Sequence, residues 1–140
     1  MKNRTDIEFI KLEADFTICK ILDLNELNFD SDFIFLSKTD DEISLVCESD
    51  KAPQNCIAAD RGWKALKIVG MLEFEMIGVI AGITCVLAEA NISVFVVSTY
   101  NTDYILLKCH DFEKSIELLK ENGYAIKDQG GLRAHNPNTS

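Results

Sequence analysis

The chain has 140 residues, of which 47% are hydrophobic and 26% charged, a composition that excludes an intrinsically disordered or collagen-like protein. Its formal net charge of −9 disfavours binding to nucleic acids and to anionic membrane surfaces, because their phosphate groups would repel it. The longest apolar run, residues 76–88, is too short to cross a bilayer, and charged residues interrupt the N-terminal segment, so we expect a soluble protein inside the cell.

The cysteines are five in number, an odd count, and none of them forms a C-x-x-C pair. Four lie inside apolar segments, where a free thiol packs as a small hydrophobic group: Cys19, Cys47, Cys85 and Cys109. We therefore expect buried structural thiols, no metal site, and the reducing environment of the cytoplasm.

The first segment with a clear pattern, residues 7–22, alternates between apolar and polar side chains. Because branched and aromatic residues are frequent in it, the pattern predicts two short strands with a turn near residues 13–15 rather than a helix. Residues 23–27 can form a short helical turn, and Asp23 is suited to cap it.

Two further strands are predicted over residues 33–37 and 43–47, joined by a polar turn over residues 38–42. Residues 48–62 contain proline, asparagine and glycine, so they are interpreted as a loop with room for a short helix. This loop is the expected boundary between two halves of the chain.

The second half begins with a strand over residues 63–70, followed by a helix over residues 75–90 whose apolar residues recur at helical spacing. Asn91 suits a left-handed position at the end of this helix. Residues 92–98 then form a strand rich in branched side chains. Gly82 within the helix is consistent with close packing or with function.

The chain is expected to turn at residues 99–103 and to return as an antiparallel strand over residues 104–109. Asp111 can cap a second helix, which Gly123 ends. A last short strand follows over residues 124–127.

The order strand, helix, strand, strand, helix, strand in residues 63–128 is that of a ferredoxin-like βαββαβ unit, with helices on one face of an antiparallel sheet. Residues 1–62 look like a degenerate copy, and residues 129–140 form a polar tail. The expected fold class is therefore α+β, with two such units packed side by side. A faint echo between residues 37–42 and 98–103 supports a duplication.

No catalytic motif is present, because the sequence lacks G-x-S-x-G, P-loop, G-x-G-x-x-G and H-E-x-x-H patterns. We therefore expect neither an enzyme nor a cofactor. Two polar turns remain, and they are either solvated hairpin residues or a site for an amino-acid-like ligand. In the second interpretation the start of the 75–90 helix near Gly78 receives the carboxylate, and Asp103 or Ser98 receives the ammonium.

The stretches FLSKTDDEISLVC (residues 35–47) and STYNTDYIL (residues 98–106) resemble tandem ACT-domain proteins. RGWKAL (residues 61–66) and AEANIS (residues 88–93) extend this similarity, which runs in the expected order over about residues 8–127. The family resembles the regulatory modules of aspartate kinases and the cytosolic arginine sensor of animal cells.

This resemblance implies that a small amino acid binds between ACT units and that the protein has no catalytic activity of its own. It assigns Asp103 to the ligand amine, and the remaining candidate residues are Ser98, Thr99, Gly78, Ile77, Thr39, Asp40 and Glu42. Ile77 and Gly78 would present backbone N–H groups to the ligand carboxylate, whereas the last three are lining candidates only.

The function expected from these observations is that of a stand-alone regulatory or sensor protein, which binds a small amino acid and acts on a regulated protein partner. A homodimer is also expected, formed through edge strands such as residues 92–98 or 63–69. The alternatives are an interaction scaffold that binds no ligand and, less favoured, a small-molecule enzyme. A thermal-shift screen against amino acids separates the first two classes.

Overall fold

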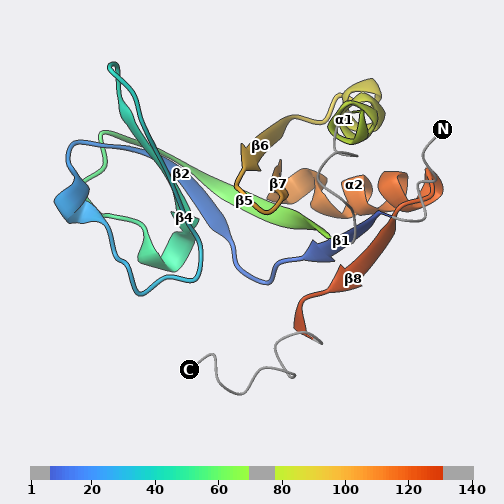
Figure 1. The fold of residues 1–140 in the computed structure, drawn as a ribbon, viewed down its shortest axis with the longest axis horizontal. Helices are drawn as coiled ribbons and strands as arrows, with labels where there is room; N and C mark the ends of the chain where they lie inside the picture. Colours follow the sequence, from blue (N-terminus) through green and yellow to red (C-terminus); the bar gives the residue numbers. More distant parts are fainter. Residues whose placement is uncertain (1–6, 70–77, 131–140) are drawn as a thin grey trace. The chain divides into compact units, whose positions relative to one another are not determined.

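The computed structural model of the chain describes residues 7–69 and 78–130 (Figure 1). These residues form two compact units. The first, which we call the middle unit, is Ala14–Trp63, and the second, the helical unit, consists of the described parts of Met1–Glu13 and Lys64–Ser140. This division differs from the expected halves because the first strand lies with the C-terminal part of the chain.

The middle unit is an antiparallel sheet in the strand order β3-β4-β2-β5, with two short 3₁₀ helices in its connections. Its elements are β2 (Phe16–Ile21), η2 (Leu24–Glu26), β3 (Ile34–Lys38), β4 (Ile43–Glu48), η3 (Ser49–Lys51) and the first part of β5 (Ala58–Val69). The element order is thus that of a βαββαβ unit in which each helix is reduced to one 3₁₀ turn.

Asp23 caps η2 as the sequence predicts. Its carboxylate accepts a hydrogen bond from Asn25 N at 2.7 Å, and the Glu26 carboxylate accepts one from Asp23 N at 3.1 Å, which completes a capping box. The paired strands predicted on either side of the 38–42 turn are also confirmed.

The predicted loop over residues 48–62 is wrong at its end, because β5 begins at Ala58 and pairs antiparallel with β2. The register of this pair shifts between Phe16 and Ile18, and Gly62 lies in that interval of β5 with a φ of +84°. A glycine in the left-handed region is typical of a β-bulge. The glycine interpreted as a loop signal therefore marks an irregularity within a strand.

The helical unit contains a sheet in the order β6-β7-β5-β1-β8 and two α-helices (Figure 1). Its elements are β1 (Glu8–Lys11), the second part of β5, α1 (Val79–Glu89), β6 (Val94–Ser98), β7 (Asp103–Lys108), α2 (Cys109–Glu121) and β8 (Ala125–Asp128). From β5 onward the order of these elements is β-α-β-β-α-β, as predicted for residues 63–128. Together the units show a mixed α+β fold.

The expectation of a wholly antiparallel sheet is wrong for the first strand. Phe9 of β1 lies opposite Ile68 of β5 in an antiparallel pair and opposite Ile126 of β8 in a parallel pair. The reason is that β1 is inserted between the first and last strands of the βαββαβ run. Because those two strands run in opposite directions, a strand between them must be parallel to one of them.

Both helices bury side chains in one core cluster with the strands, so they cover the same face of the sheet, as expected. The cluster includes Phe9, Leu66, Ile68, Ile83, Leu87, Ile105, Leu107, Ile116 and Leu119. Gly82 of α1 belongs to this packing, because a Cβ added there would lie 3.3 Å from Tyr124 Oη. This distance supports the packing explanation for Gly82.

The helix ends differ in part from the prediction. The described part of the first helix starts at Val79, and Asn91 after its end has the expected left-handed φ of +61°. The second helix begins at Cys109, with Lys108 as its N-cap, so Asp111 is not the cap. Strand β7 runs directly into this helix, and Asp111 lies in its first turn, where a carboxylate is favourable to the helix dipole.

The burial predicted for the cysteines holds for two of the four and is wrong for the other two. Cys19 and Cys47 are buried on strands of the middle unit, whereas Cys85 and Cys109 are exposed on helices. A helix turns one face outward even when its sequence is apolar, and this explains the exposed thiols. None of the helices within residues 7–69 and 78–130 is long and apolar enough to cross a membrane.

Candidate functional site

The turn between β6 and β7 is closed by Thr99 and Thr102. Thr99 N donates to Thr102 O at 2.9 Å, and the Thr99 hydroxyl accepts from Thr102 N at 3.3 Å. The Thr102 hydroxyl donates to Ile68 O at 2.6 Å, which ties the turn to β5 near the end of that strand. The hydroxyl of Thr99 is thus engaged in the turn itself.

Asp103 is the first residue of β7 and only 9% exposed. Successive side chains of a strand alternate between its two faces, so Asp103 shares a face with Ile105 and Leu107. Both of those residues belong to the core beneath the helices. The carboxylate therefore lies on the helix-covered face of the sheet, at the end of the strand.

Ser98 is the last residue of β6 and lies directly opposite Asp103 in the antiparallel pair. Side chains of directly opposed residues project from the same face, with Cβ atoms about 4.5–5.5 Å apart. The structure thus brings two of the sequence-predicted residues together. Ser98 is exposed, so the buried carboxylate has an accessible hydroxyl as its neighbour.

Gly78 is the N-cap of α1 and has a φ of +90°, a conformation that side-chain-bearing residues rarely adopt. It makes no side-chain cap, and a Cβ added there would meet nothing within 4 Å. The backbone at this helix start is therefore accessible. Ile77, the other residue assigned to the ligand carboxylate, lies outside the described residues.

Thr39, Asp40 and Glu42 are exposed at the tip of the β3–β4 hairpin in the middle unit. The Thr39 hydroxyl accepts from the backbone N–H groups of Asp41 and Glu42, each at 3.2 Å. This is the arrangement of a hydroxyl that stabilises a turn.

The two hairpins have the same hydrogen-bond pattern, but the structure aligns them one residue away from the alignment suggested by the sequence. Thr39 N donates to Glu42 O at 2.9 Å, so Thr39 is the counterpart of Thr99. Lys38 and Ile43 close this hairpin as Ser98 and Asp103 close the other. The alignment of residues 37–42 with 98–103 is wrong because turn geometry, and not residue identity, sets the register. The counterpart of Asp103 in the middle unit is the apolar Ile43.

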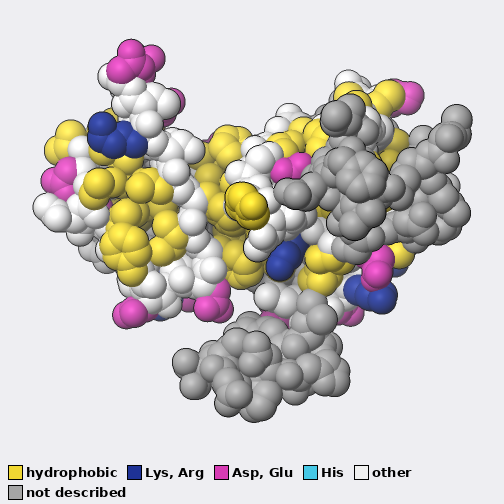
Figure 2. All heavy atoms as spheres, in the orientation of Figure 1, with side chains coloured by type: hydrophobic (Ala, Val, Ile, Leu, Met, Phe, Trp, Pro, Cys, Tyr) yellow, Lys and Arg dark blue, Asp and Glu magenta, His cyan; other side chains and the backbone are white. Residues whose placement is uncertain are grey.

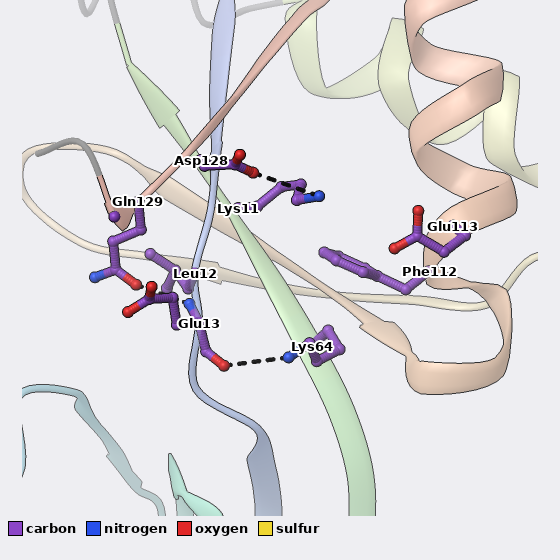
Figure 3. Close-up of a pocket in the computed structure, with 9 residues that line it drawn as sticks. Lys11, Leu12, Glu13, Lys64, Phe112, Glu113, Asp128 and Gln129 are labelled. Carbon is purple, nitrogen blue, oxygen red and sulfur yellow. Dashed lines mark hydrogen bonds and ion pairs between the residues drawn. The ribbon is translucent and has the colours of Figure 1, made fainter.

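A pocket of about 510 Å³ in the helical unit was not predicted from the sequence (Figure 3). It is lined by Lys11, Leu12, Glu13, Lys64, Phe112, Glu113, Asp128, Gln129 and Gly130. These residues come from segments far apart in the chain, and β1 was assigned to the other half. Only the pairing of β1 with β5 and β8 brings them together.

Among the described residues, no group of three or more His, Cys, Asp or Glu side chains could hold a metal ion. Cys19, Cys47 and Cys56 do share one hydrophobic cluster in the middle unit. Burial, with smaller contributions from Cys56 and Cys47, raises the pKa of Cys19 to about 12. A thiol with so high a pKa stays protonated at neutral pH and is a poor nucleophile.

Residues 58–121 match the family model of the ACT domain. Among solved structures, a protein from Agrobacterium tumefaciens is 28% identical, with a TM-score of 0.78 over 87% of this chain and 92% of that one. A Vibrio cholerae protein of unknown function, described as a possible transport protein, is 19% identical, with a TM-score of 0.69 over 86% of this chain and 93% of that one.

The aspartate kinase of Clostridium acetobutylicum, described as an allosteric enzyme, is 17% identical, with a TM-score of 0.58 over 81% of this chain and 33% of the kinase. No curated protein is significantly similar in sequence. At 17–19% identity the Vibrio protein and the kinase show a shared fold only. The family match covers β5, both helices and the hairpin that carries Asp103. The family match therefore confirms the resemblance to ACT proteins for residues 58–121, which make up just under half of the chain.

Proposed function

We propose that this chain is a regulatory sensor that binds a small amino acid at the β6–β7 end of its ACT domain and performs no chemistry on it. The observation that carries the proposal is the position of Asp103. Its carboxylate is nearly buried, lies on the helix-covered face, and follows a turn that is tied to the end of β5. A carboxylate placed at the edge of a core, where its burial is costly, is a candidate for binding a cationic group.

The ligand would bind through its two charged groups. Asp103 would accept hydrogen bonds from the ammonium, and the Ser98 hydroxyl beside it would accept another. The backbone N–H groups at the start of α1, with Gly78 and Ile77, would receive the carboxylate, because a helix start favours negative charge. Gly78 suits this role because it leaves the backbone accessible. Thr99 would shape the turn beneath the ligand.

A second copy of the chain would complete the site. Strand β6 pairs only with β7 among the strands of the described residues, so its other edge can pair with another chain. The alternative edge over residues 63–69 is excluded, because β5 lies within the sheet and pairs with β1, β2 and β7. Thr39, Asp40 and Glu42, exposed at their hairpin tip, would be lining residues of the partner surface at most.

Two further features support the proposal. The clustered free thiols of Cys19, Cys47 and Cys56 support a reducing compartment such as the cytoplasm. The order of elements in the middle unit supports a second, degenerate ACT-type unit. The regulated protein partner would recognise the ligand-bound state of the sensor.

A thermal-shift screen against the proteinogenic amino acids tests this function. A ligand present at a hundredfold excess over its Kd should stabilise the protein by about 2.7 kcal/mol, a readily measured rise in Tm. Light scattering with and without the ligand reports the dimer. If no amino acid raises Tm at millimolar concentration, the proposal is wrong and an interaction scaffold becomes the better explanation.

A further inference from the structure

The pocket of about 510 Å³ lies at the other end of the same sheet from Asp103. Thr102 contacts β5 at Ile68, whereas the pocket contacts it at Lys64. Four residues of a strand span about 13 Å, so one ligand the size of an amino acid cannot occupy both places. The volume is within the range of about 300–1,000 Å³ that is usual for small-molecule sites.

The strand side of the pocket is held in place by hydrogen bonds. Leu12 N donates to Ala65 O at 3.0 Å, and Gln129 N donates to Lys11 O at 3.2 Å. The side-chain oxygen of Gln129 accepts from Glu13 N at 2.7 Å. These bonds join the segments that follow β1 and β8, so this wall is formed before any ligand binds.

Two lysines stand on the strand side of the pocket (Figure 3). Lys64 Nζ donates to Glu13 O at 3.2 Å, which holds this ammonium group on the strand side. Lys11 Nζ lies 3.5 Å from Asp128 Oδ1, but the Asp128 side chain is 81% exposed. An ion pair this exposed is worth little, so a ligand carboxylate can compete for Lys11.

The opposite wall is the N-terminal part of α2, which provides Phe112 and Glu113. Figure 3 shows the Phe112 ring projecting from the helix toward the strand side, with the Glu113 side chain next to it. Phe112 is only 5% exposed, so it forms a firm apolar surface, and Leu12 on the strand side is buried as well. The helix thus presents a carboxylate and an aromatic ring to the two ammonium groups of the strands.

The charges of the lining select the class of ligand. A simple anion would meet the carboxylates of Glu13, Glu113 and Asp128, and a simple cation would meet Lys11 and Lys64. A zwitterion can satisfy both sets. Because Lys11 and Lys64 project from the strands and Glu113 from the helix, the ligand's charged groups must be several bonds apart.

We propose that this pocket binds a small ω-amino acid, in which a short methylene chain separates the carboxylate from the ammonium. The carboxylate binds Lys11 and Lys64, the ammonium binds Glu113, and the methylene chain packs on Phe112. An α-amino acid carries both charges on one carbon and cannot span the walls. This site is independent of the one proposed at Asp103 and differs from it in ligand class.

Titration of the full-length protein with 5-aminopentanoate, followed by calorimetry and by amide NMR shifts, tests the proposal. We expect saturable binding, with shifts at Lys64, Phe112 and Gln129. Norvaline, pentanoate and pentylamine are the matched probes, since each lacks the separated pair of charges, and each should bind at least about tenfold more weakly.

Glu113→Gln and Lys64→Met should each weaken 5-aminopentanoate about 10- to 100-fold, because each removes a charge-assisted hydrogen bond. Glu117→Gln, which changes an exposed residue one turn further along α2 and outside the lining, should leave the affinity unchanged. Glu113 is exposed, so its variant keeps the test valid even if Lys64→Met fails to fold.

Asp103→Asn distinguishes the two sites. It should leave binding of 5-aminopentanoate intact while it weakens the α-amino acid found in the thermal-shift screen. Absence of binding at millimolar 5-aminopentanoate, or equal affinity of the Glu113→Gln variant and the parent, would overturn the pocket proposal and leave the proposed sensor function standing. If 5-aminopentanoate binds but no α-amino acid does, the pocket proposal stands and the proposed sensor function is wrong.

Discussion

The β3–β4 and β6–β7 hairpins are closed by the same bonds but lead into different strands. In each, a threonine N–H donates at 2.9 Å to the carbonyl three residues later, and the threonine hydroxyl accepts from the turn. The strand that follows begins with Ile43 in one hairpin and with Asp103 in the other. The turn is therefore a common scaffold, and the residue after it decides whether a charge enters the core.

What covers the following strand differs as well. The β3–β4 hairpin belongs to a unit whose 14–63 segment contains only 3₁₀ helices, and Thr39, Asp40 and Glu42 remain exposed at its tip. The β6–β7 hairpin belongs to the unit with both α-helices, where α1 packs on the face that carries Asp103. The carboxylate of Asp103 is nearly buried because its strand face has this helical cover. In the space-filling view (Figure 2), one of several groups of acidic side chains lies at the tip of the β3–β4 hairpin.

The largest difference expected between the two hairpins is in ligand affinity. Asp103→Asn keeps the shape of the side chain but removes its charge, and the affinity for the α-amino acid ligand should fall about 10- to 100-fold. Asp41→Asn is the control, because Asp41 is exposed in the other turn and its affinity effect should be negligible. Calorimetry on folded variants measures both. Equal affinities for the Asp103 variant and the parent would remove Asp103 from the site.

The next effect concerns the hydrogen bond that ties the β6–β7 turn to β5. Thr102→Val removes the hydroxyl that donates to Ile68 O and should cost about 1–3 kcal/mol in the free energy of unfolding, because a part-buried carbonyl loses a hydrogen-bond partner. Glu42→Gln changes the equivalent residue of the β3–β4 turn, which is exposed, and should stay within about 0.5 kcal/mol of the parent. Urea denaturation measures both changes.

The sequence was sufficient to predict the strands, the order of elements in residues 63–128 and the role of Asp23, because each depends on neighbours in the chain. The insertion of β1 between β5 and β8 was not predictable, because pairing between strands that are distant in sequence leaves no local pattern. Gly62 was interpreted as a loop residue for a related reason. A bulge and a loop both use glycine, and only the partner strand distinguishes them.

The candidate site was predictable only in part. Asp103 and Ser98 flank one short turn, so the sequence places them together, and the strand pairing shows that they lie opposite one another. The pocket on the other end of the sheet combines residues from β1, β5, α2 and β8. No motif connects these segments in the sequence, and a lysine or glutamate at a strand end is ordinary surface composition. Tertiary structure was needed to find it.

If the two turns share one scaffold, replacing the turn threonine should cause the same, smaller loss of stability in each hairpin. Thr39→Val and Thr99→Val each remove a hydroxyl that accepts backbone N–H groups, and each should cost about 0.5–1.5 kcal/mol of stability. The two costs should add in the double variant, because the residues belong to separate compact units. Urea denaturation of the two single variants and the double variant provides the comparison. Unequal costs would show that the turns differ in more than the residue that follows them.

The last expected difference is in the reactivity of the cysteine thiols of the two units. Cys85 and Cys109 are exposed on helices, so both should react with a thiol reagent in the folded protein at neutral pH. Cys19 and Cys47 should not, because both are buried and burial raises both pKa values, that of Cys19 to about 12.

The same burial predicts the sign of a pH effect on stability. In the unfolded chain the thiol of Cys19 ionises near pH 8.5–9, whereas in the folded protein it stays protonated until about pH 12. The contribution of this thiol is therefore complete below about pH 8.5 and is lost as the pH rises toward 12. Cys19→Ala should flatten this part of the profile, and Cys85→Ala should leave it unchanged, because Cys85 is exposed. A profile of the Cys19→Ala variant as steep as that of the parent would show that other groups carry the alkaline loss of stability.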